Sequence, residues 1–188
     1  MVIYAIFAQF FDMELIDGKY LVQGIGLHAI AQEYGTPVYV YDGHKMVSQL
    51  HNLKNAFSEN PLKIKFAMKS LSNISILKLL HQHGAGIDAV SINEARLALG
   101  AGVTGADINF TPNGVDFSEI EEGVDLGLSV NLDNLSALEK FGKKYGASYP
   151  CGIRLNPHIM AGGNYKISTG HSNSKFGISI YQLPDVLR

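Results

Sequence analysis

Cysteine is almost absent from this chain. Its 188 residues include a single cysteine, Cys151, which excludes internal disulfide bonds and cysteine-rich zinc sites. A chain of this kind suits a reducing cytosol, so we expect a cytoplasmic protein. Because Cys151 precedes an apolar strand, we expect it to be a small buried side chain rather than a nucleophile.

Strong charge and long apolar runs are also missing. The net charge is −2 and no basic cluster is present, which argues against nucleic acid as the main partner. Residues 1–12 contain an apolar run that is too short to span a bilayer and lacks the features of a signal peptide. We therefore expect no membrane partner, and we expect this atypical extension to be disordered or peripheral.

The chain does contain a recurring unit of apolar strand, polar loop, amphipathic helix and glycine. Alternation of strands and helices with short loops predicts a parallel sheet. The predicted strands are residues 38–41, 64–68, 86–90, 107–111, 128–131 and 151–155, and helices follow the first five. Six strands without an obvious break favour an α/β fold of the (β/α)8 TIM-barrel type over an open sheet.

A (β/α)8 barrel needs eight strands and typically about 250 residues, more than this chain supplies. We therefore expect an incomplete barrel, present as part of a longer chain. The expected organisation is the extension at 1–12, a strand and helix segment at 13–36, and a partial barrel at 37–188.

Lys69 directly follows the predicted strand 64–68. The C-terminal ends of the strands are where α/β barrels place their chemistry. Lysine suits imine chemistry, because burial or a nearby cation lowers its pKa and frees the amine to attack a carbonyl. Position alone favours an ordinary solvated lysine, since most lysines lie at the surface.

Two other charged residues are expected at the same end of the barrel. Asp88 lies in an otherwise apolar strand, where a carboxylate needs a partner, and Lys69 or Arg154 would serve. An ordinary Asp88–Arg154 ion pair that closes the barrel explains these residues equally well. The other polar residues expected at strand ends are Tyr41, Asp42, Thr111, Asn113 and Asn131.

Other motifs give weaker signals. His81 and His83 do not share a helix face, so no metal site is expected there. The stretch from Gly24 to Ala29 fits the dinucleotide fingerprint, and Asp42 follows at a plausible distance. The strand before it is short and polar at its start, unlike a buried central strand. A dinucleotide-binding domain built on Gly24 and Gly26 is therefore a competing hypothesis.

Three parts of the chain together resemble the fold type III, alanine-racemase-like pyridoxal-phosphate decarboxylases. The resemblance covers residues 13–188, and its third part most resembles the diaminopimelate decarboxylase branch. The parts are Phe66-Ala67-Met68-Lys69, then Gly86-Ile87-Asp88-Ala89-Val90-Ser91-Ile92-Asn93-Glu94, and then Arg154-Leu155-Asn156-Pro157 with Ile167-Ser168-Thr169-Gly170 and Ser174-Lys175-Phe176-Gly177.

The resemblance implies roles for four residues. Lys69 would form the Schiff base with pyridoxal 5′-phosphate, and Ala67 would pack beside the cofactor ring. Asp88 would lie close to both, and Arg154 would support that neighbourhood. The implied reaction is decarboxylation of meso-diaminopimelate to L-lysine and CO2. The implied partners are a small amino-acid substrate and, in the full-length protein, a second copy in a homodimer.

Several family elements are implied to follow residue 188. They include the ring-stacking histidine, the glycine-rich phosphate loop, the glutamate at the pyridine nitrogen, the substrate-binding arginine and a C-terminal β-domain. We therefore expect this chain to be inactive alone. Two departures, Ser70-Leu71-Ser72 before Asn73 and Asn164-Tyr165 in place of a histidine, bear on the branch. A decarboxylase of the ornithine or arginine type and a non-catalytic cofactor-binding relative remain alternatives.

Overall fold

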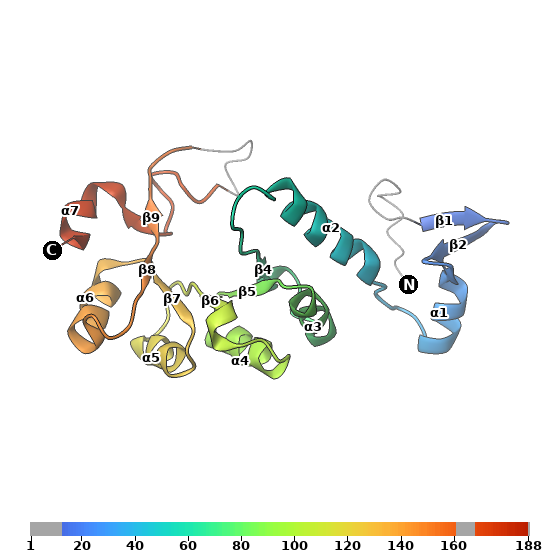
Figure 1. The fold of residues 1–188 in the computed structure, drawn as a ribbon, viewed down its shortest axis with the longest axis horizontal. Coiled ribbons are helices and arrows are strands. Elements are labelled where there is room, and N and C mark those ends of the chain that lie inside the picture. Colours follow the sequence, from blue (N-terminus) through green and yellow to red (C-terminus); the bar gives the residue numbers. More distant parts are fainter. Residues whose placement is uncertain (1–12, 161–167, 188) are drawn as a thin grey trace. The chain divides into compact units, whose positions relative to one another are not determined.

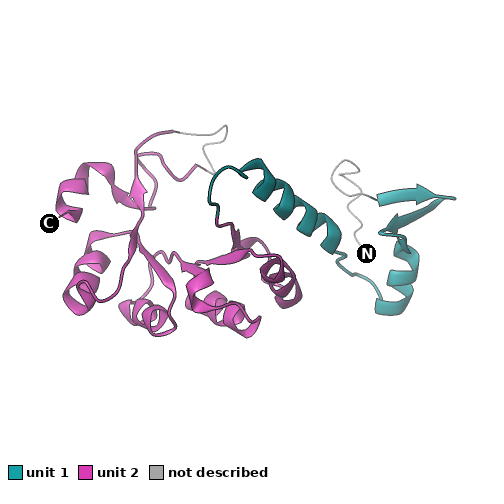
Figure 2. Ribbon diagram, in the orientation of Figure 1, with its two compact units in different colours: residues 1–62 teal, residues 63–188 magenta. Residues whose placement is uncertain are grey.

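The computed structural model describes residues 13–160 and 168–187, so the predicted extension at 1–12 lies outside the described residues. The chain divides into two compact units, residues 1–62 and residues 63–188 (Figure 2). The predicted boundary at 36/37 differs from this division, because residues 37–62 fall in the first unit. That residues 37–62 belong to a barrel stays a prediction.

The first unit contains a small antiparallel sheet with the strand order β1-β2-β3. Asp17 and Gly18 form the two-residue turn between β1 and β2, and both have positive φ, as a tight hairpin requires. The elements of this unit are β1 (Met13–Ile16), β2 (Lys19–Val22), β3 (Ile25–Gly26), α1 (Leu27–Tyr34) and α2 (Gly43–Ala56).

This unit does not support the dinucleotide hypothesis. The fingerprint works in a parallel βαβ unit, whereas β2 pairs antiparallel with both β1 and β3. Asp42 does not end a strand. Its carboxylate accepts a hydrogen bond from the Lys45 amide at 3.0 Å and so caps α2.

The predicted strand at 38–41 is wrong, because the structure has no strand there. A strand needs a hydrogen-bonded neighbour, and an alternating pattern does not supply one. Burial does alternate along the segment: Tyr39 is 87% exposed and Tyr41 44% exposed, while Val38 and Val40 are partly buried, so the missing feature is the paired strand. The helix predicted to follow it is present as α2.

The second unit is built on a parallel sheet with the strand order β4-β5-β6-β7-β8. One α-helix follows each of the first four strands along the chain (Figure 1). This arrangement is that of part of a (β/α)8 barrel, which confirms the predicted fold class. The strands are β4 (Lys65–Ala67), β5 (Gly86–Ala89), β6 (Ile108–Phe110), β7 (Ser129–Leu132) and β8 (Gly152–Ile153), and the helices are α3 (Ile74–Gln82), α4 (Ile92–Gly100), α5 (Phe117–Asp125) and α6 (Leu135–Tyr145).

The predicted strand at 151–155 is divided into β8 and β9 (Leu155–Asn156). Arg154 lies between them and changes partners. Its amide donates to the Leu132 carbonyl, and its carbonyl accepts from the Ile178 amide, both at 2.8 Å. The chain is therefore paired with β7 before Arg154 and with β10 (Ile178–Ser179) after it. β10 pairs parallel with β9. The chain then continues through η4 (Ile180–Gln182) into α7 (Leu183–Val186).

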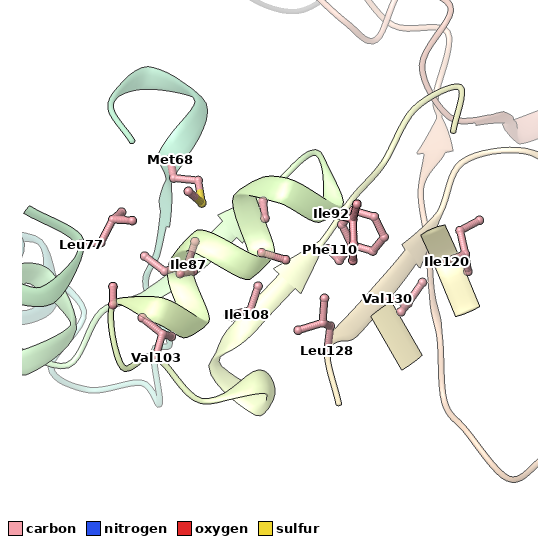
Figure 3. Packing of buried hydrophobic residues seen from close by; sticks show 14 of the residues in the cluster. Met68, Leu77, Ile87, Ile92, Val103, Ile108, Phe110, Ile120, Leu128 and Val130 are labelled. Carbon is pink, nitrogen blue, oxygen red and sulfur yellow. The ribbon is translucent and has the colours of Figure 1, made fainter. Parts of the chain in front are cut away.

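Side chains alternate across the parallel sheet, and one face is apolar. Ile87, Ile108, Phe110 and Val130 point toward the helices and are at most 1% exposed (Figure 3). Leu132 belongs to the same buried cluster and is 1% exposed. Burial of each such side chain contributes roughly 1.5–3 kcal/mol of favourable free energy, so this layer is a main stabilising feature of the unit.

The helix starts follow the capping patterns in the sequence. Ser91 accepts from the Glu94 amide at 3.2 Å, and the Glu94 carboxylate accepts from the Val90 amide at 2.7 Å. Asn73 and Asn134 cap α3 and α6 with side chains that accept hydrogen bonds from backbone amides of the first turn, without a reciprocal bond of this kind. The pattern Asp116-Phe117-Ser118-Glu119 also predicts a helix cap, but the Asp116 side chain makes no hydrogen bond that caps α5.

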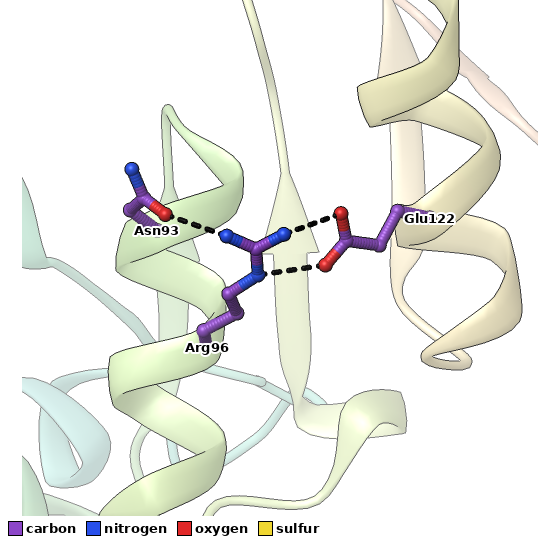
Figure 4. A network of polar contacts seen from close by, with 3 residues as sticks. All are labelled: Asn93, Arg96 and Glu122. Atoms are coloured by element: carbon purple, nitrogen blue, oxygen red, sulfur yellow. Dashed lines mark hydrogen bonds and ion pairs between the residues drawn. The ribbon is translucent and has the colours of Figure 1, made fainter.

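The outer surfaces of α4 and α5 are joined by an ion pair. Arg96 donates two hydrogen bonds to Glu122, each 2.7 Å long, and a third to Asn93 at 2.8 Å (Figure 4). The pair is exposed to solvent, so it orients the two helices more than it stabilises them. Within the described ranges, no helix is long and apolar enough to cross a membrane.

Replacing Ile87 by alanine should lower the free energy of unfolding by about 2–5 kcal/mol, because it leaves a cavity between the sheet and its helices. Ile153→Ala is the matched control, since Ile153 lies in the same sheet but is 40% exposed. Urea unfolding measures both variants. An equal loss in the two would contradict the packing described for Ile87.

Candidate functional site

The candidate site lies at the carboxyl ends of the parallel strands, which meet at one edge of the sheet. Lys69 occupies the turn η1 (Met68–Ser70), directly after β4, and is exposed. Met68 is fully buried, and the Ser70 hydroxyl donates to the Ala67 carbonyl at 2.7 Å. The turn is thus anchored on both sides of Lys69, while the amine itself remains accessible.

The sheet face opposite the helices is polar. Its residues follow from the strand register, which places Ala67 beside Asp88, Asp88 beside Asn109, and Asn131 beside Gly152. Ala67 adds only a methyl group to this face, and Gly152 adds no side chain. In a closed barrel this face is the interior, so the polar side chains would line the lumen rather than solvent.

Asp88 is a carboxylate on the polar face of the sheet. It is half-buried, and its Oδ1 accepts a hydrogen bond of 3.3 Å from the Thr111 hydroxyl. Asn131 in turn donates from Nδ2 to the Thr111 hydroxyl oxygen at 2.9 Å. Side chains from three neighbouring strands are therefore linked in one line across the polar face.

Burial raises the pKa of the Asp88 carboxyl above its ordinary value. The hydrogen bond from Thr111 and the positive charges of Lys69 and Arg154 act in the opposite direction but do not cancel the effect of burial. The pKa of Asp88 thus depends on the opposing effects of burial and of nearby hydrogen bonds and positive charges. Carboxylates with such perturbed pKa values are typical of functional sites.

Arg154 does not form the ion pair with Asp88 that one of the two hypotheses from the sequence expected. Within the described residues, no ion pair closer than 4.0 Å joins Arg154 to Asp88, so the ordinary ion pair is not formed. The guanidinium carbon instead lies 4.5 Å from the centre of the Phe176 ring. Arg154 influences Asp88 through its charge at longer range.

A cleft of about 520 Å³ lies beside Arg154, and Ser168, Thr169 and Phe176 also line it. It brings together the segments that carry the third part of the family resemblance. Ile167, which belongs to the same part, lies outside the described residues.

The residues at this edge fit pyridoxal phosphate chemically. Lys69 offers an accessible amine, and Ala67 leaves space beside it. Asp88 and Arg154 supply opposite charges that act on one another. The roles of these four residues in holding the cofactor remain predictions.

Sequence reasoning named Thr111 and Asn131 only as strand-end residues and gave no role to Gly152. The alternation in residues 107–111 and 128–131 contained the signal, because polar residues at every second position mark a second, polar face. The hydrogen bonds between strands could not be read from this pattern.

Cys151 packs against the buried cluster as a half-buried side chain, and burial raises the pKa of its thiol. A thiol kept protonated is a poor nucleophile, which agrees with the packing role expected for it.

The chain matches the family described as "Pyridoxal-dependent decarboxylase, pyridoxal binding domain" over residues 44–188. The diaminopimelate decarboxylase of Methanothermobacter thermautotrophicus is 34% identical to it over 180 residues. These residues make up 94% of this chain and 42% of that protein, so the chain spans well under half the length of this relative.

Solved structures give the same picture. The diaminopimelate decarboxylase from Helicobacter pylori complexed with L-lysine is 33% identical, with a TM-score of 0.78, and the match covers 85% of this chain and 41% of that one. The enzyme from M. jannaschii in complex with L-lysine is 26% identical, with a TM-score of 0.82, and the match covers 93% and 43%.

Asp88→Asn should change how stability depends on pH. A carboxyl with a raised pKa makes the fold less stable as pH rises from the unfolded value, about 3.9, through the folded pKa. The variant lacks this loss. It should therefore be more stable than the unmodified protein at neutral pH, and the difference should shrink toward acid pH. Thermal unfolding across the pH range tests this, and a difference independent of pH would contradict it.

Proposed function

This chain belongs to the pyridoxal-dependent decarboxylases, and we propose that it forms the cofactor-binding part of a diaminopimelate decarboxylase. The full-length enzyme would convert meso-diaminopimelate to L-lysine and CO2. The observation that carries the proposal is Lys69, an accessible amine at a parallel strand end with Asp88 close enough to respond to its charge. The similarity to proteins named diaminopimelate decarboxylase supports the choice of substrate.

Lys69 is proposed to bind the cofactor covalently through its amine. When bound, pyridoxal phosphate supplies an electron sink for the electron pair left behind as the carboxylate departs as CO2. Ala67 leaves room beside the amine, because any larger side chain at this register position would project onto the same polar face. The anchored turn around Lys69 limits how far the amine moves, which favours a fixed orientation of bound groups.

Asp88 and Arg154 are proposed to set the electrostatics around Lys69. A carboxylate at Asp88 favours positive charge nearby, and the Thr111 hydrogen bond helps to keep Asp88 ionised despite its burial. Arg154 is held against Phe176, so its charge acts from a defined place. These residues would orient and polarise bound groups at the strand ends.

The chain spans 42% of the length of its Methanothermobacter relative, so the whole activity is proposed for the full-length protein. We propose that the 188-residue chain alone is inactive, since the groups implied to hold the cofactor phosphate and the substrate are not in it. We also propose a homodimer in the cytoplasm.

The cofactor site can be tested by adding pyridoxal phosphate, reducing with borohydride, and mapping the modified peptide by mass spectrometry. We expect Lys69 to carry the label in the full-length protein and Lys69→Ala to lose it. Lys78→Ala is the control, since Lys78 is an exposed lysine of α3. Labelling scattered over several lysines would refute the cofactor site.

The substrate requires a separate measurement of CO2 release from meso-diaminopimelate and from ornithine. The full-length protein should prefer meso-diaminopimelate, and the 188-residue chain should release no CO2 from either. A preference for ornithine would favour the ornithine-type alternative. Cofactor labelling without any CO2 release would favour a non-catalytic relative.

A further inference from the structure

The line Asn131–Thr111–Asp88 has a direction that follows from its donors and acceptors. An amide nitrogen can only donate, so Asn131 Nδ2 must use a lone pair of the Thr111 oxygen. The hydroxyl of Thr111 has a single hydrogen, and this hydrogen then remains available for Asp88. The line therefore delivers a hydrogen-bond donor to the carboxylate rather than an acceptor.

Gly152 determines whether the Asn131 amide can lie in this position. Asn131 and Gly152 are register partners on β7 and β8. A Cβ on Gly152 would overlap the side-chain oxygen of Asn131, so the amide occupies the space that any other residue would fill. The absence of a side chain at Gly152 lets the Asn131 oxygen rest over β8 while its nitrogen faces Thr111.

We propose that Asn131 is a positioning residue, which acts through Thr111 to hold a hydrogen-bond donor on the Asp88 carboxylate, with Gly152 providing the space its amide needs. The link to catalysis rests on the proposed function, in which Asp88 acts beside Lys69. The hydrogen-bond line itself is a property of this chain and does not depend on a cofactor.

Other charged groups also act on Asp88 and must stay constant in a test. Three of them act on Asp88 from the turn after β4, from α4 and from the β8–β9 junction. The fourth is a lysine of β4 whose own pKa is affected by Asp88. These groups are Lys69, Glu94, Arg154 and Lys65. Neutral substitutions at positions 111, 131 and 152 leave all these charges in place, so such variants report on the hydrogen bonds alone.

The test is an NMR titration of 13C-labelled aspartate in the full-length protein without added cofactor, with Asp88→Asn used to assign the resonance. Thr111→Val removes the donor and should raise the pKa of Asp88 by about one pH unit, as expected for a hydrogen bond to a charged group. Thr111→Ser keeps the hydroxyl and should leave the titration close to its original midpoint.

Asn131→Leu should raise the Asp88 pKa in the same direction, because Thr111 is then free to turn its hydrogen away. Asn131→Ala removes the donor without added bulk and should have the same effect. Ser129→Ala is the matched control, since Ser129 lies two residues earlier on the same strand face, and it should have no effect.

A double variant decides whether Asn131 acts through Thr111. In the Thr111→Val background, Asn131→Leu should produce no further change in the Asp88 pKa. An equal change in both backgrounds would overturn the proposal, and so would an unchanged midpoint in Thr111→Val.

Gly152→Ala should reproduce the effect of Asn131→Ala and add nothing to it in the double variant. An unchanged Asp88 midpoint in Gly152→Ala would refute the role of Gly152. Because the titration needs no cofactor, it can fail while Lys69 labelling succeeds, and the reverse is equally possible. The positioning proposal and the proposed function are therefore tested separately.

Discussion

The parallel pairing of β4 through β8 is the constraint on which the rest of the second unit depends. Parallel strands place their carboxyl ends at the same edge of the sheet, and crossover helices must then cover one face. Ile87 and Phe110 are buried because helices cover their face (Figure 3). Lys69, Asp88 and Arg154 lie at one edge of the sheet because their strands end there, and the two cations act on Asp88 through their charge. The same pairing pattern therefore produces both the buried apolar face and the edge at which the candidate site lies.

Asp88 shows how the two faces of the sheet are coupled. Its neighbours along β5, Ile87 and Ala89, are both fully buried, so the strand cannot move outward to hydrate the carboxylate. Burial therefore raises the pKa of Asp88, and the polar face must supply the compensating groups. Thr111 provides a direct hydrogen bond, while Lys69 and Arg154 contribute charge from further away. The core fixes where the carboxylate lies, and the polar face sets its protonation.

The first unit shows that a short motif has meaning only in its structural setting. Gly24 and Gly26 match the dinucleotide fingerprint, but they lie at an antiparallel β2–β3 pair instead of a parallel βαβ turn. The Asp17-Gly18 turn was the informative signal in this region, because an Asp-Gly pair favours a two-residue hairpin. The turn residues thus indicate the local structure here, although no hairpin was predicted from them, whereas the pattern of spaced glycines does not.

The amino-acid sequence by itself determined the order of strands and helices from β4 to β8, the apolar face of the sheet, and the positions of Lys69 and Asp88 toward the carboxyl ends of their strands. These features depend on local periodicity, capping residues and chain punctuation, which can be read along the chain. The family resemblance, which rests on short stretches of sequence, also came from this level.

The tertiary structure alone decided which residues pair across strands. It separated residues 38–41 from any strand partner, divided the last predicted strand at Arg154, and placed Arg154 against Phe176 instead of Asp88. It also joined Asn131, Thr111 and Asp88 and left Gly152 open for the amide. Such contacts link residues distant in the chain, and their geometry depends on strand register and packing, which local sequence patterns do not contain.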